Sequence, residues 1–164
     1  MLRQMLIMGL LALPAGISFA TDTNIREANH PATATERLSD LSLHANWQVR
    51  RAVAGNRHSP ASLLKQLASD PDLRVRIAVV TNLSSPDSIH QYLARDEESA
   101  VRSVIARFEY VSAEVLNILS KDSDPDIRLE VAGNWNTSVA TLKRLRQDDY
   151  QQVRQRAELE LSKR

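Results

Sequence analysis

Residues 49–56 read Val-Arg-Arg-Ala-Val-Ala-Gly-Asn, and altered copies of this stretch recur along the chain. The pair Val-Arg begins at residues 49, 75, 101 and 153, and Ile-Arg begins at 127, so successive pairs are 26 residues apart. Residues 49–74 and 75–100 share 11 of 26 positions, whereas about one or two identities are expected from ordinary residue usage. A fixed period of roughly 20–50 residues is typical of solenoid proteins, whose units cover each other's apolar faces.

The first half of each unit has the pattern of one amphipathic helix. Val49, Ala52 and Val53 recur at helical spacing and form one apolar face. Asn56 ends this pattern, and Asn residues commonly take the left-handed conformation at a helix C-terminus. We therefore expect a structural ladder of such caps, because the same position holds Asn82 and Asn134 in two other units.

The second half of each unit has the pattern of another short helix. It starts at Ser59-Pro60, where Ser is expected to be the N-cap and Pro the first helical residue. Leu63, Leu64 and Leu67 then form its apolar face. Helices of about nine or ten residues are marginal alone in water, so they must pack on their neighbours. The sequence predicts an all-α fold, an α-solenoid of 26-residue helix–turn–helix repeats.

Residues 1–20 have the pattern of a signal peptide. Arg3 precedes an apolar run, and small residues at Ser18 and Ala20 precede a predicted cleavage point. We expect cleavage after Ala20, with a periplasmic or secreted mature chain and no membrane span, and a retained N-terminal anchor as the alternative. The four parts of the expected domain organisation are residues 1–20 (signal peptide), 21–44 (a loose leader, Thr21–His30, then a capping half-repeat), 45–148 (four repeats) and 149–164 (a capping helix).

The amino-acid composition excludes several classes of functional site. The chain of 164 residues has 21 Lys and Arg, 20 Asp and Glu, and no cysteine. Without cysteine it has no iron–sulfur cluster, no thiolate zinc site, no lipid-bearing cysteine and no cysteine nucleophile. Removal of residues 1–20 would take away Arg3 and leave a net charge of zero, which makes nucleic-acid binding unlikely.

The motif at residues 49–56 resembles the leucine-rich repeat variant family, within the HEAT-like superfamily of α-helical repeats. The Ser-Pro and trailing Leu residues match as well, and an Asp stands six residues before the Arg of most units, as Asp70 does before Arg76. The resemblance implies a right-handed superhelix of stacked short helices and a role in binding other proteins. The chain departs from the pattern in its third unit, which has Phe108 in place of Asn and no Pro after Ser112. It also lacks the N-terminal cysteine cluster that members of this family can carry.

Several charged residues favour a structural role over a catalytic one. The recurring Asp and Arg residues are expected to pair and tie unit to unit. Glu130, on an apolar stripe, is expected to pair with a neighbouring Arg, and His90 is expected to be a half-buried structural residue. Residues 122–133 fail the calcium-loop pattern, because Ile127 and Gly133 stand where Gly and Glu are required. No acid–base–nucleophile set, cofactor motif or metal-ligand spacing appears, so we predict no enzyme, no cofactor and no metal.

Two surfaces remain as candidate binding sites. Stacked units would bring the turns between helices together along one rim, and the rim side chains include the aromatic and Arg types favoured at interfaces. The alternative is that they fold back onto their own helices. The second helices would offer a polar, mildly basic face, which the HEAT resemblance places in a concave groove; a merely solvated face is the alternative. The predicted partner-binding residues are Arg57, His58, Leu83, Tyr110 and Trp135 on the rim, and Lys65, Tyr92, Arg95, Lys121 and Lys143 on the second helices.

These patterns predict an exported, non-catalytic repeat protein that binds a protein or peptide through its solenoid surface. The alternative is binding of a polyanion, a nucleic acid or an anionic glycan, through the mildly basic groove. An enzyme or an accessory to an enzyme is the third and least favoured class.

Overall fold

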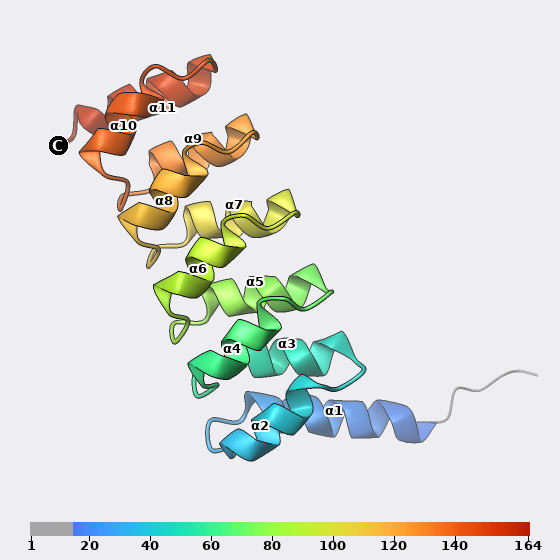
Figure 1. Cartoon of the computed structure of the whole chain (residues 1–164). Coiled ribbons are helices and arrows are strands. Elements are labelled where there is room, and N and C mark those ends of the chain that lie inside the picture. The colour runs from blue at the N-terminus through green and yellow to red at the C-terminus, as the bar shows by residue number, and fades with distance from the viewer. Residues whose placement is uncertain (1–14) are drawn as a thin grey trace, which may run out of the picture.

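The computed structural model describes the backbone of residues 15–164 and the side chains from residue 20 onward. Over this range the chain forms eleven α-helices and no strand, stacked in a single column (Figure 1). The first helices of the helix pairs are α1 (Ala15–Asn29), α3 (Trp47–Gly55), α5 (Leu73–Thr81), α7 (Ser99–Arg107), α9 (Pro125–Gly133) and α11 (Gln151–Leu161). The second helices are α2 (Thr35–Ser42), α4 (Ala61–Leu67), α6 (Asp87–Leu93), α8 (Ala113–Leu119) and α10 (Val139–Leu145). The predicted all-α solenoid is confirmed.

Repeats 1 to 4 are the pairs α3–α4, α5–α6, α7–α8 and α9–α10, and their core consists of the two predicted apolar stripes. Val49 and Val53 of α3 are fully buried, as is Leu64 of α4. The same positions are buried in later repeats, for example at Val75, Val79, Val101, Ile105, Leu116 and Leu142. Because each stripe is covered by the neighbouring repeat, helices of seven to nine residues hold together here although they would be marginal alone. Among the described helices, none is long and apolar enough to cross a membrane.

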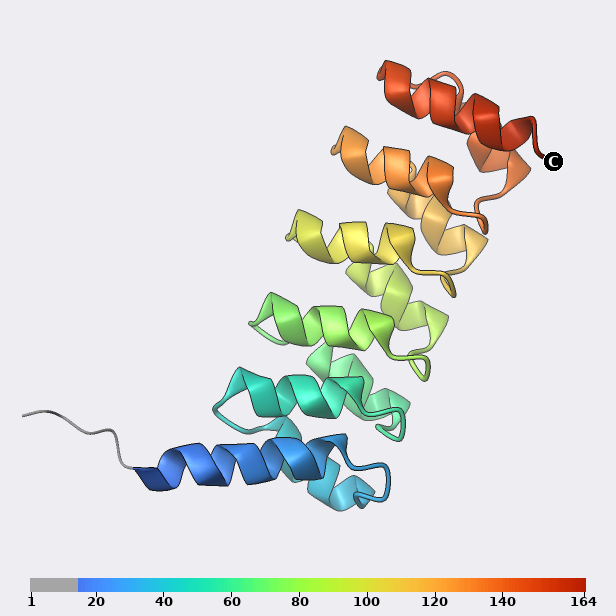
Figure 2. The same ribbon diagram turned by 180° about the vertical axis from the view of Figure 1, so that it is seen from behind.

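The two kinds of helix form two layers with different spacing. Consecutive first helices pack against each other along the whole column, whereas α4–α6 and α8–α10 pack far less closely (Figures 1 and 2). The layer with the closer spacing lies on the inner side of a curved stack. The expectation that the second helices line a concave groove is therefore wrong, because their wider spacing puts them on the outer side.

The N-terminal region also differs from the prediction. Thr21–His30 was expected to be a loose leader, but most of it belongs to α1, which packs on α2 and α3. Ala28 is fully buried, and Glu27 forms a bidentate ion pair with Arg37 of α2. The repeat pattern was hidden because Glu27 stands where repeat 1 has Val53, so an ion pair replaces an apolar contact. Of the predicted signal peptide, residues 1–14 lie outside the described residues, and its cleavage stays a prediction.

The Ser-Pro pairs cap the preceding helix, and the predicted Ser N-cap is wrong for repeats 1 and 2. Ser59 Oγ donates to the main-chain oxygen of Val53 at 2.6 Å, and Ser85 Oγ donates to that of Val79. These oxygens belong to the last turn of a first helix, where carbonyl groups lack helical partners. Pro then takes the N-cap position with no side-chain hydrogen bond. In repeats 3 and 4 a Ser stands at the position of that Pro and is the N-cap: Ser112 Oγ accepts from the amide of Val115, and Ser138 Oγ accepts from the amide of Thr141.

Candidate functional site

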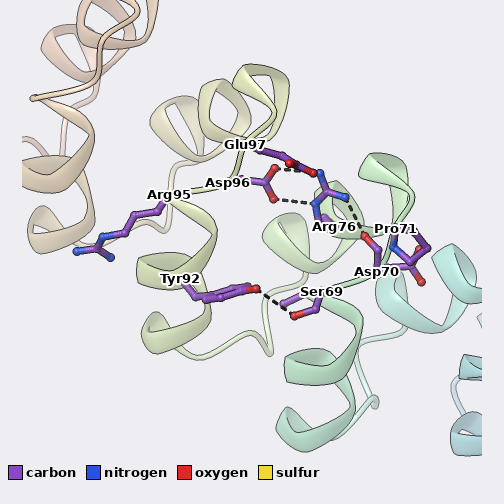
Figure 3. Close-up of a pocket in the computed structure, with 9 residues that line it drawn as sticks. Ser69, Asp70, Pro71, Arg76, Tyr92, Arg95, Asp96 and Glu97 are labelled. Carbon is purple, nitrogen blue, oxygen red and sulfur yellow. Dashed lines mark hydrogen bonds and ion pairs between the residues drawn. The ribbon is translucent and has the colours of Figure 1, made fainter.

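Four ion pairs connect the loops that join successive repeats. Arg76 donates from Nε and Nη2 to the two carboxylate oxygens of Asp96, at 2.7 and 2.9 Å. Its Nη1 donates to the main-chain oxygen of Asp70, in the loop before its own helix, at 2.8 Å (Figure 3). Each arginine thus bridges two inter-repeat loops, and the predicted structural pairing is confirmed. The pairs are Arg50–Asp70, Arg76–Asp96, Arg102–Asp122 and Arg128–Asp148, with side chains only 4–15% exposed.

The asparagines form a second series of contacts, at the opposite end of the helix pairs. Asn82 donates from Nδ2 to the main-chain oxygens of Ala54 and Asn56, at 2.7 and 2.9 Å, and its Oδ1 accepts from the amide of Ser84. The predicted ladder is confirmed, but its left-handed geometry is wrong: Asn82 has φ −76° and ψ 117°. The extended backbone lets the amide reach two carbonyl groups of the preceding repeat. Asn56 and Asn134 make the equivalent bonds.

Repeat 3 breaks this ladder, and His90 compensates. Phe108 has the same extended backbone as the asparagines but has no amide to donate to the oxygen of Val80. His90 of α6 places its Nε2 at 3.0 Å from that oxygen, which requires the proton to be on Nε2. The His90 ring also meets the edge of the Phe108 ring at 5.6 Å. His90 is a structural residue as predicted, although it is fully rather than half buried.

The rim, defined by Arg57, His58, Leu83, Tyr110 and Trp135, consists of exposed side chains on the turns between the two helices of each repeat. Leu83 and Trp135 occupy one position of the repeat, which holds Glu109 in repeat 3, and Tyr110 occupies the next position; 69–70% of each of the three is exposed. They are not buried against their own helices, although the Tyr110 ring contacts the Phe108 ring of its own repeat, with the centroids 5.7 Å apart. Arg57 and His58 are exposed as well.

Hydrogen bonds join the rim turns of repeats 1 and 2 and those of repeats 3 and 4. Ser84 Oγ donates to the main-chain oxygen of Arg57 at 2.6 Å, and Asn136 Nδ2 donates to that of Glu109 at 2.7 Å. Arg164 of the C-terminal segment donates to the oxygen of Trp135. Among the described residues no such bond joins the turns of repeats 2 and 3, so Leu83 and Tyr110 are held relative to each other by the packing of their repeats, at about one helix-packing distance of 10 Å.

The outer, second-helix face holds the other predicted residues, all of them exposed: Lys65, Tyr92, Arg95, Lys121 and Lys143. A furrow of about 470 Å³ runs between α4 and α6 and is lined by Tyr92 and Arg95 (Figure 3). Several of its polar groups are paired with each other: Tyr92 Oη lies 3.1 Å from Ser69 Oγ, and Arg76 is held by Asp96. The Arg95 side chain extends away from that ion pair in Figure 3. The Tyr92 hydroxyl and the Arg76 guanidinium are therefore already engaged within the protein and are not free to bind a ligand.

The remaining ionisable candidates have ordinary structural surroundings. Glu130 lies 4.0 Å from Arg107, the predicted ion pair with a neighbouring Arg. Hydrogen bonds from the Arg128 guanidinium hold the pKa of Asp148 below its usual value. Among the described residues, no group of three His, Asp or Glu side chains is placed to hold a metal ion.

The inner, first-helix face contains two hollows that the sequence interpretation overlooked. One of about 340 Å³ lies between α1, α3 and α5 around Arg51 and Gly55, and one of about 430 Å³ lies between α7, α9 and α11 beside Trp135. Gly55 is part of the repeat motif, and its lack of a side chain at the end of α3 leaves room for the first hollow. The sequence feature that could have indicated this hollow is a glycine in the last turn of an otherwise regular helical pattern.

Comparisons with known proteins gave a family match and a structural match. The family described as "Leucine rich repeat variant" matches residues 47–72, which span α3, α4 and the loop that follows. A solved structure titled "A leucine-rich repeat variant with a novel repetitive protein structural motif" is 24% identical with a TM-score of 0.45, and the match covers 84% of this chain. The chain spans 65% of the length of that protein. A search of curated proteins gave no match.

Proposed function

Residues 47–72 match the leucine-rich repeat variant family, and on that premise we propose that the chain is a repeat protein of this type and that it binds a protein or peptide partner through the rim without catalysing a reaction. The observation that carries the proposal is the line of Leu83, Tyr110 and Trp135, at least two-thirds exposed in consecutive repeats. Tyr and Trp are enriched among the residues that dominate binding energy at interfaces.

The rigidity of the rim supports the same function. Ser84 and Asn136 bind the main chain of the preceding turn, so the rim side chains project from a backbone that is already ordered. A preformed surface loses less conformational entropy when a partner binds. We place the binding in the periplasm or outside the cell, on the basis of the signal pattern in residues 1–20.

The test is partner capture by in-cell crosslinking, followed by mutation of the rim. We expect the double variant Tyr110→Ala, Trp135→Ala to lose the captured partner while its helical circular dichroism is unchanged. Tyr92→Ala is the matched control, because Tyr92 is 58% exposed but lies on the outer face. Capture that survives in the double variant, or that is lost equally in Tyr92→Ala, would refute a role for the rim.

A second candidate function is favoured by the charge of the outer face. Lys65, Arg95, Lys121 and Lys143 are exposed in four successive repeats and form no ion pair among the described residues. Such a row suits a polyanion, whose binding weakens steeply with salt. With a single-stranded oligonucleotide and a sulfated glycan as probes, polyanion binding predicts an affinity that falls severalfold or more between about 50 and 200 mM salt. A rim-bound protein partner would show only a slight dependence.

A further inference from the structure

The hollow between α1, α3 and α5 on the inner face has a lining suited to a ligand with both apolar and charged groups. Ile25 of α1, Ala52 of α3 and Ile77 of α5 supply its apolar part. Asn29 and Gln48 add amide groups at its border. Its volume of about 340 Å³ lies within the range of pockets that hold small ligands or single side chains of a partner.

Gly55 keeps this hollow open, and nothing in the fold demands a glycine there. A Cβ atom at residue 55 would meet no atom within 4 Å, and no described glycine has a positive φ. Gly133, at the equivalent position of repeat 4, is different, because a Cβ there would lie 3.0 Å from Arg156 Nη2. Glycine weakens a helix relative to other residues, so at position 55 its effect is to leave space without any gain in packing.

Arg51 supplies the charge in the hollow. It is exposed and forms no ion pair or hydrogen bond with another described side chain, whereas its neighbours Arg50 and Arg74 each bind an aspartate. None of the residues that line the hollow is acidic. The hollow therefore combines an apolar floor with one uncompensated guanidinium, and a carboxylate is the group that complements it best.

We propose that this hollow binds an acidic peptide segment of a partner protein, with an Asp or Glu carboxylate on Arg51 and an adjacent apolar side chain against Ile25 and Ile77. The amides of Asn29 and Gln48 hydrogen-bond the peptide backbone. The inference rests on the proposed peptide-binding function, but it uses the inner face, whereas the rim is a separate surface.

The experiment uses an array of short peptides in which Glu or Asp alternates with Leu or Val, and a matched array with Gln and Asn. The acidic peptides are expected to bind the full chain and the amide peptides to bind at least tenfold more weakly, as expected for loss of a charge-assisted hydrogen bond. Arg51→Gln should weaken binding of the acidic peptides by a similar factor. Arg95→Gln, a matched change on the outer face, should leave it unchanged.

Gly55→Leu separates ligand binding from folding. Since a side chain at residue 55 meets open space and Leu favours helix, this variant should melt at the same temperature or higher while losing the acidic peptides. Failure of every acidic peptide to bind, equal binding of the amide array, or unchanged binding in both Arg51→Gln and Gly55→Leu would overturn the proposal. If Arg51→Gln and Gly55→Leu also keep the cellular partner that the Tyr110→Ala, Trp135→Ala variant loses, peptide binding in the hollow is refuted, whereas partner binding at the rim is supported.

Discussion

The junction between repeats 1 and 2 and the junction between repeats 2 and 3 are held alike at one end and differently at the other. At the loop end, both are spanned by an arginine that binds an aspartate and a main-chain oxygen, Arg50 in one and Arg76 in the other. At the turn end, Asn82 donates two hydrogen bonds across the first junction. Phe108 replaces that amide at the second junction, where α5 and α7 also pack less closely than α3 and α5.

The difference separates two tasks that asparagine performs together. One is to satisfy a buried carbonyl group at the end of a first helix, which is costly to leave without a partner. His90, which belongs to the same repeat as Val80, donates the hydrogen bond to the Val80 oxygen in place of an asparagine. The other task is to join neighbouring repeats, and at this junction only the ring contact between Phe108 and His90 replaces the polar bridge. Repeats 2 and 3 are therefore joined with less polar cross-linking at the turn end.

The largest expected effect comes from breaking the contact that both junctions share. Arg76→Ala leaves Asp96 without its partner, although both side chains are less than a tenth exposed. We expect a loss of roughly 3–5 kcal/mol in the free energy of unfolding, measured by urea denaturation. Arg50→Ala, at a more exposed pair, should cost less. Equal, small losses in both variants would mean that these ion pairs do not secure the junctions.

The second prediction removes the polar bridge from the first junction. Asn82→Ala takes hydrogen bonds from the buried oxygens of Ala54 and Asn56 and should cost roughly 2–3 kcal/mol. The control is Gln66→Ala on the exposed outer face, which should change stability by less than about 0.5 kcal/mol. A cost for Asn82→Ala no greater than that of the control would show that the ladder is not needed for stability.

The third prediction concerns variants that give the junction between repeats 2 and 3 the asparagine found at the junction between repeats 1 and 2. His90→Leu leaves the oxygen of Val80 without a donor and should cost roughly 1–2 kcal/mol. Adding Phe108→Asn should recover much of this loss, because residue 108 already has the extended backbone of the ladder asparagines. Thermal and urea unfolding of the two single variants and the double variant give the coupling energy. Strictly additive losses would contradict the compensation of Phe108 by His90.

The repeat period made most of the fold predictable. Apolar stripes such as Val49 with Val53, and the recurrence of Asp and Arg, follow directly from the sequence because each repeat presents the same pattern to its neighbour. The N-terminal helix was missed because Glu27 interrupts that pattern and is compensated by Arg37, which lies ten residues further on. Pairwise compensation of this kind is visible only when both partners are seen together.

The candidate sites were predictable only in part. Leu83, Tyr110 and Trp135 could be identified because they occupy two adjacent positions of the repeat, and their exposure follows from those positions in the turn. The hollow around Arg51 and Gly55 could not, because it depends on which helix layer is the inner one and on Arg51 having no partner. Neither property follows from the spacing of residues along one repeat.

The smallest expected effect concerns the loops at the same two junctions. Asp72 caps α5 and pairs with Arg74, whose hydrogen bonds lower the pKa of Asp72 to about 2. Glu98, at the equivalent position before α7, makes no cap hydrogen bond. Because the pKa of Asp72 in the folded chain lies below the unfolded value of about 3.9, its stabilising effect is complete above about pH 4 and is lost as the pH falls toward about 2.

Asp72→Asn keeps an oxygen that can cap α5 but removes the titrating carboxylate. The variant should melt slightly below the unmodified chain at neutral pH, and this difference should disappear as the pH falls from about 4 to about 2. Glu98→Gln is the comparison variant at the equivalent position, where no side-chain cap bond is made. Melting curves followed by circular dichroism across this range provide the measurement. If the Asp72 variant kept its deficit at low pH, the deficit would come from a weaker helix cap, and the ion pair with Arg74 would not distinguish the two loops.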